Sequence, residues 1–94
     1  MALFAVLLPQ ESPAVVASIK AKFPDNKHYK INSTQWIVSG TGSAEQISDI
    51  IGITGEDNST IGSGVVLAFT GYWGRANNSL WEWMRVKLEE RVNG

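Results

Sequence analysis

The sequence predicts a single α+β domain built from four strands and three helices. Two apolar runs, Leu3 to Leu8 and Val65 to Thr70, have the length and composition of buried strands. Two shorter strand-like runs lie on either side of a cluster of turn-forming residues, and three segments open with helix-start signals. With 94 residues, of which 44% are apolar and 18% charged, the chain has room for one hydrophobic core.

The first strand leads into a helix. Leu3 to Leu8 is apolar at consecutive positions, which predicts a strand covered on both faces. Ser12 has the side chain of an N-cap, and Pro13 suits the first helical position, where no amide hydrogen is needed. The apolar residues that recur at helical spacing are Val15, Val16, Ile19 and Phe23. They predict the buried stripe of a helix that Pro24 ends.

A β-hairpin and a second helix follow. His28 to Ile31 and Gln35 to Ser39 read as short strands, and the turn formers at 32–34 separate them. Ser43 and Gln46 have the spacing of a capping box, which predicts the start of a helix that runs through Ile51. The side chains expected to form its buried face are Ile47, Ile50 and Ile51.

The remaining segments are a loop, a strand and a final helix. Gly55 to Gly64 has no sustained period and predicts a mobile loop. Val65 to Thr70 is the last strand. Ser79 and Glu82 repeat the capping-box spacing and predict a helix from Leu80 to about Val92. Its core stripe consists of Leu80, Trp81, Met84, Leu88 and Val92.

This order of elements resembles a ferredoxin-like βαββαβ sandwich, an antiparallel sheet with two helices on one face, extended here by a C-terminal helix. Because the first and last strands are apolar on both faces, the second face of the sheet also needs a cover, which the final helix, a second subunit or both would supply. Trp83 and Val86 lie off the stripe of the final helix and favour an oligomer interface there. We therefore expect a homo-oligomer, with a dimer favoured. The alternative is that Trp83 folds back over its own strand-to-helix turn.

Composition excludes several classes of function. Eight basic and nine acidic residues give a net charge of −1, so no global field attracts nucleic acid or an anionic membrane. The absence of cysteine excludes disulfides and thiolate catalysis. No run approaches the roughly 18 apolar residues that span a bilayer, and the apolar N-terminal segment reads as a strand. The expectation is a soluble, cytoplasmic protein without a membrane partner.

Aromatic residues around an arginine are the leading candidate for a binding site. Tyr72, Trp73 and Arg75 follow the last strand, where a guanidinium can stack on a ring and still bind a carboxylate, a phosphate or a carbonyl. We therefore expect a non-enzymatic interaction or small-ligand-binding domain, with a small ligand or a protein as partner. The alternative is that Arg75 caps the strand end or pairs with Glu82 while the aromatic residues fill the core.

A second interpretation is a nucleic-acid-associated protein. The basic residues that could hold phosphates are Lys20, Lys27, His28 and Lys30. Tyr29 or Trp36 offers a ring on which a base could stack. The competing interpretation is that these lysines are solvated ends of elements, with Lys30 protecting an edge strand from aggregation.

A small enzyme is the third interpretation, with His28 or Asp57 as acid or base beside Arg75. Neither a serine-nucleophile elbow nor a paired-carboxylate arrangement supports it. Glu56 and Asp57 lack the spacing of a calcium loop, and the glycine-containing turn at 39–43 lacks the lysine of a phosphate-binding loop. We expect no metal and no cofactor.

Overall fold

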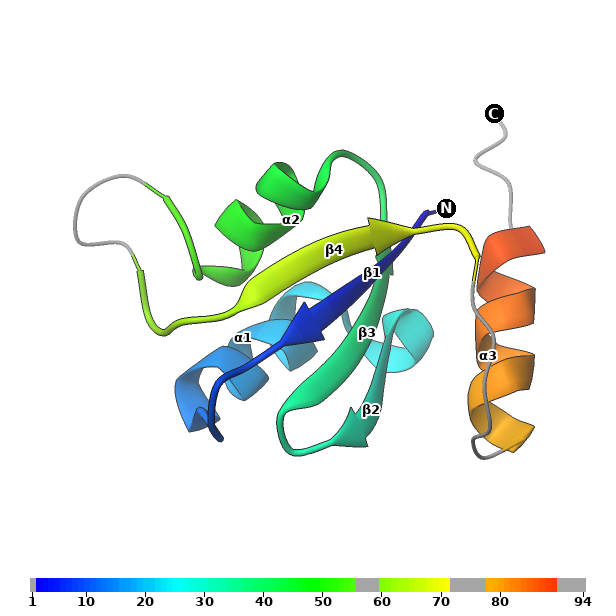
Figure 1. The fold of residues 1–94 in the computed structure, drawn as a ribbon, viewed down its shortest axis with the longest axis horizontal. Coiled ribbons are helices and arrows are strands. Elements are labelled where there is room, and N and C mark those ends of the chain that lie inside the picture. Colours follow the sequence, from blue (N-terminus) through cyan, green and yellow to red (C-terminus); the bar gives the residue numbers. More distant parts are fainter. Residues whose placement is uncertain (1, 56–59, 72–77, 90–94) are drawn as a thin grey trace.

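The computed structural model describes residues 2–55, 60–71 and 78–89, which form a four-stranded antiparallel sheet and three helices of the α+β class (Figure 1). The strands are β1 (Ala2–Leu7), β2 (His28–Asn32), β3 (Gln35–Gly40) and β4 (Val65–Phe69). The helices are α1 (Pro13–Lys22), α2 (Ala44–Ile51) and α3 (Asn78–Glu89), with a short 3-10 turn, η1 (Asp25–Lys27), between α1 and β2.

The sheet has the strand order β2-β3-β1-β4, and every neighbouring pair is antiparallel. β1 and β3 are therefore the central strands, and β2 and β4 are the edges. Because β3 lies between β1 and β2 and is antiparallel to both, α1 connects two parallel strands that are not neighbours. The helix α2 connects β3 and β4 in the same way.

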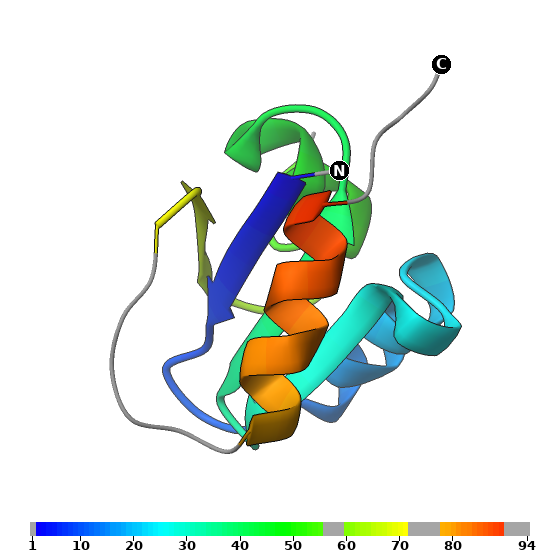
Figure 2. The same ribbon diagram turned by 90° about the vertical axis from the view of Figure 1, so that its right-hand side faces the viewer.

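Helices lie on both faces of this sheet. One face packs against α1 and α2, whereas α3 stands against the opposite face (Figures 1 and 2). The core on the first face consists of Phe4, Val6, Leu8, Val15, Ile19, Phe23, Trp36, Val38, Ile47, Ile51 and Ile53. The smaller core under α3 consists of Leu3, Ile37, Leu80 and Met84. Successive residues of β1 enter different cores, which explains its unbroken apolar run.

Local hydrogen bonds start the first two helices as predicted. The Ser12 hydroxyl accepts from the amide of Val15 at 3.3 Å, which makes Ser12 the N-cap of α1. At α2 the Ser43 hydroxyl accepts from the Gln46 amide at 3.1 Å, while the Gln46 side chain accepts from the Ser43 amide at 2.8 Å. The capping box is therefore confirmed. Gly52 ends α2 with a φ of 102°, a conformation that favours glycine.

The structure corrects the predicted burial of α2. Ile47 and Ile51 are buried, but Ile50 is 46% exposed. Ser48 takes the third buried position of the helix instead, and its hydroxyl forms a hydrogen bond with the hydroxyl of Thr54 at 2.9 Å. The apolar pattern alone could not reveal this choice, because the hydrogen bond that offsets the burial of a serine comes from a later loop.

The start of α3 also differs from the prediction. The helix begins at Asn78, so Ser79 belongs to its first turn and is not the N-cap. The Ser79 hydroxyl lies 2.6 Å from the phenol oxygen of Tyr29 on β2, a contact between distant parts of the sequence. Parts of two predictions, the loop at 56–59 and the end of the last helix at 90–92, lie outside the described residues.

Candidate functional site

The residues expected to bind a ligand, Tyr72, Trp73 and Arg75, lie outside the described residues, as does Asp57. Their predicted roles therefore stay predictions. The described part of the chain offers three surfaces of its own: an apolar groove beside α3, the outer edge of β4, and a basic pocket at Trp36.

Trp83 lies against the turn that precedes β2. Its indole nitrogen donates to the carbonyl oxygen of Asn26 at 2.9 Å, and its ring centroid is 5.7 Å from that of Tyr29, with the planes tilted by 49°. Trp83 thus has partners within its own chain, on η1 and β2. Val86, the other residue expected at an oligomer interface, is 45% exposed.

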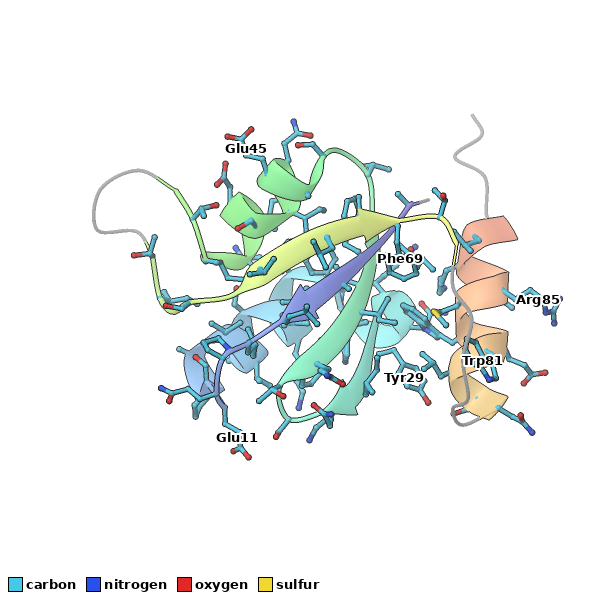
Figure 3. The ribbon with its side chains drawn as sticks, in the orientation of Figure 1. Glu11, Tyr29, Glu45, Phe69, Trp81 and Arg85 are labelled. Atoms are coloured by element: carbon cyan, nitrogen blue, oxygen red, sulfur yellow. The ribbon has the colours of Figure 1, made fainter. Side chains whose placement is uncertain are left out.

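The apolar groove lies where α3 stops covering the sheet. It has a volume of about 340 Å³. The residues lining it are Ala5, Leu7, Ile31, Gln35, Trp36, Ile37, Phe69, Leu80, Trp81 and Met84. Figure 3 shows that Tyr29 and Phe69 extend from the sheet towards α3, whereas Arg85 points away from it. Apart from the indole N–H groups of Trp36 and Trp81, Gln35 is the one polar side chain among the described lining residues, so this groove suits apolar contact and offers no acid or base there.

Exposed apolar side chains continue from the groove towards β4. In the register of the sheet, Leu7 lies opposite Val65 and Ala5 lies opposite Leu67, so all four residues share one face. Val65 is 54% exposed and Leu67 is 48% exposed. The face that α3 partly covers is therefore apolar as far as the edge strand.

The two edges of the sheet differ in chemistry. The β2 edge carries His28, Lys30 and Asn32, and its pairing with β3 shifts register between Lys30 and Asn32. Charge and irregularity of this kind protect an edge from pairing with another chain. The β4 edge, Val65–Phe69, has no charged residue and no proline, and within the described residues it pairs only with β1. Among the described residues, the β4 edge therefore lacks the protection seen at β2.

Three of the four basic residues proposed for nucleic acid converge on Trp36. Lys20 comes from α1, whereas His28 and Lys30 come from β2. The two ammonium groups lie 6.0 Å and 5.9 Å from the centroid of the indole, and the imidazole centroid lies 5.9 Å from it. Lys27 belongs to the neighbouring turn η1. A basic cluster therefore exists, built by packing of α1 onto the hairpin.

His28 has a defined orientation in this cluster. Its Nδ1 lies 2.6 Å from the carbonyl oxygen of Phe23. Because a carbonyl only accepts hydrogen bonds, Nδ1 carries the hydrogen, and Nε2 is the acceptor of the neutral ring. This bond holds the imidazole at the end of α1.

The basic pocket beside this cluster has a volume of about 200 Å³. Its lining consists of Glu11, Ser12, Pro13, Val16, Lys20, Lys30, Ser33 and Trp36. Trp36 is only 2% exposed, so protein atoms cover the faces of its ring. The expected stacking of a base on Trp36 does not fit this burial. Its buried Nε1 has no hydrogen-bond partner among the residues that the structure describes.

The described ranges give no support to the other chemistries considered. Within them, no group of three or more His, Cys, Asp or Glu residues could hold a metal ion, and no helix is long and apolar enough to cross a membrane. At the turn before α2, the Ser43 amide that a phosphate could use already donates to Gln46.

Comparisons of the chain with known protein families, with curated proteins and with solved structures give no match. The function must therefore be inferred from the three surfaces. Sequence reasoning did not single out Leu7 and Leu67, although two signals pointed to them. The first strand was apolar on both faces, and the last strand contained no charge.

Proposed function

We propose that the protein is a non-enzymatic interaction domain that works as a homodimer. A ferredoxin-like topology is part of this proposal. The antiparallel strand order β2-β3-β1-β4 supports it, as do the two crossover helices on one face, with α3 as an addition. The partner of this domain is a second copy of the chain.

The observation that carries the proposal is the uncharged β4 edge, which has no second strand partner within the described residues and lies beside an exposed apolar face. An edge strand presents unpaired amide and carbonyl groups that can pair with another strand. Here the same strand also exposes Val65 and Leu67, whose burial would add apolar contact to the hydrogen bonds. The polar, irregular β2 edge of the same sheet lacks this combination.

The sequence of β4 suits pairing with itself. In an antiparallel pair centred on Leu67, Val65 of one copy lies opposite Phe69 of the other, and Leu67 lies opposite Leu67. All these side chains point to the same face of the sheet, while Val66 and Ala68 share the other face. A two-fold axis through Leu67 thus brings apolar residues together on both faces, as a closed symmetric dimer requires.

The test is the molar mass in solution, measured by size-exclusion chromatography with light scattering over a range of concentrations. The wild type should be a dimer. Leu67→Lys places a charge on the edge and in the apolar contact, and should weaken the dimer about 30-fold or more. The matched control is Ile50→Lys, which places the same charge at a similarly exposed isoleucine on α2, and should leave the dimer intact.

Two further variants separate the ways in which copies could associate. Ile31→Lys alters the same sheet face at the opposite edge, and Val86→Lys alters the outer side of α3. Dissociation by either variant, with Leu67→Lys remaining dimeric, would assign the interface to the sheet face or to α3 and exclude pairing through β4. A wild type that stays monomeric at high concentration would refute the homodimer.

A further inference from the structure

We propose that the basic pocket at Trp36 is a binding site for a compact oxyanion of the phosphate type. The site lies between the start of α1 and the β2-β3 hairpin. It is independent of the proposed dimer, because Lys20 and Lys30 reach it from the side of the sheet that packs against α1. Nucleic acid is the competing ligand, and the burial of the Trp36 ring argues against it.

The charge at the site is the first argument. The Lys20 and Lys30 ammonium groups both lie within 6.0 Å of the same indole, so they approach the pocket from two elements. Within the described residues, neither ammonium has a carboxylate partner at salt-bridge distance. An anion between them would accept charge-assisted hydrogen bonds from both, which are stronger than bonds between neutral groups.

The indole of Trp36 is the second argument. Within the described residues its Nε1–H is buried and lacks an acceptor, and Trp36 lines both this pocket and the apolar groove, so a ligand in the pocket reaches this donor only when the side chains that cover it move. A buried donor without a partner is unfavourable, and an acceptor oxygen supplied by a ligand would remove this deficit. Tryptophan provides only a donor at this position, so the missing partner must be an acceptor.

The size of the pocket and its lining limit the ligand further. A volume of about 200 Å³ is below the roughly 300–1,000 Å³ of sites for drug-sized molecules, which favours a compact group. Ser12 and Ser33 add hydroxyl groups to the lining. Glu11 is the one acidic residue there, and its repulsion keeps the affinity for an anion modest.

The experiment is an NMR titration of the indole N–H signals with inorganic phosphate, against sodium chloride at equal ionic strength. Loss of one signal in Trp36→Phe assigns the Trp36 resonance. We expect a saturable shift of this signal with phosphate and none with chloride. Lys20→Gln and Lys30→Gln should each weaken binding about tenfold, since each removes a charged hydrogen-bond donor.

Two variants act as opposite controls. Glu11→Gln should tighten binding several-fold, because it removes the repulsive charge from the lining. Lys22→Gln should leave the affinity unchanged, because Lys22 lies on α1 outside the lining. Glu11, Lys20, Lys22 and Lys30 are exposed, so their replacement should not disturb the core. Well-dispersed amide signals in the NMR spectrum show that each variant is folded.

Glycerol phosphate, titrated in parallel, distinguishes a free ion from a phosphate ester. Equal affinities indicate the free ion, tighter binding of the ester indicates an esterified ligand, and both results support the oxyanion site. The proposal is wrong if the Trp36 signal does not move up to about 100 mM phosphate, or if chloride moves it equally. It is also wrong if a single-stranded oligonucleotide binds while phosphate does not. None of these outcomes depends on whether the protein is a dimer.

Discussion

The indole nitrogen of Trp83 lies 2.9 Å from the carbonyl oxygen of Asn26, 57 positions away in the sequence. This bond attaches α3 to the turn η1. The contact between the Tyr29 and Ser79 hydroxyl groups attaches the first turn of the helix to β2. Together with the small core around Leu80 and Met84, these contacts hold α3 against the second face of the sheet.

Two substitutions of Trp83 should show separately how much its hydrogen bond and its ring contact contribute to stability. Trp83→Phe keeps a ring beside Tyr29 but leaves the Asn26 carbonyl without this donor, so the free energy of unfolding should fall by about 1 kcal/mol. Trp83→Ala should lower it further, because the ring contact is also lost. Urea denaturation measures both changes. Equal stability of Trp83→Phe and the wild type would show that the bond contributes nothing.

Met84 should contribute more to the docking of α3 than any hydrogen bond. It is buried in the core under the helix, so Met84→Ala should lower the free energy of unfolding by about 2–4 kcal/mol. Val86→Ala, on the exposed side of the same helix, should change it by less than about 0.5 kcal/mol in the monomer. Denaturation curves of the two variants at low protein concentration test this, and similar losses would contradict the assigned core.

Only one of two serines should lose stability when it is replaced by alanine. The Ser39 hydroxyl is buried and has no hydrogen-bond partner in the described part of the chain, so Ser39→Ala should leave stability unchanged or raise it by about 1 kcal/mol. The Ser18 hydroxyl donates to the Ile51 carbonyl at 2.5 Å and links α1 to α2, so Ser18→Ala should lower stability by about 1 kcal/mol. Thermal unfolding of both variants gives the comparison. A strong loss in Ser39→Ala would mean that its hydroxyl has a partner, such as a bound water.

The capping box of α2 should behave as one unit. Ser43→Ala should lower the free energy of unfolding by about 1 kcal/mol, because the Gln46 amide loses its acceptor. The bond from the Ser43 amide to the Gln46 side chain depends on the same geometry, so the effects of Ser43→Ala and Gln46→Ala should not be additive. A double-mutant cycle by chemical denaturation measures the coupling, and strict additivity would show two independent bonds.

The sequence predicts the members of the basic cluster but not the burial of the ring at its centre. The short sequence separation of Lys20, His28 and Lys30 predicts a basic patch, and the structure places the three side chains around one indole. The hairpin register places Lys30 opposite Trp36, and the packing of α1 brings in Lys20. The burial of the Trp36 ring, which argues against a base stacked on it, could not be seen in the sequence, because it depends on the fit of α1 against the hairpin.

The sequence by itself determined the kinds of element and most of their boundaries. The capping residues of α1 and α2, the turn at 32–34 and the uninterrupted apolar run of β1 act through neighbours a few positions away, so their effect can be read locally. Only the tertiary structure decided that Ile50 is exposed, that Ser79 contacts Tyr29, and that β4 is an edge strand. Each of these depends on contacts between segments distant in sequence, which neither periodicity nor local propensity encodes.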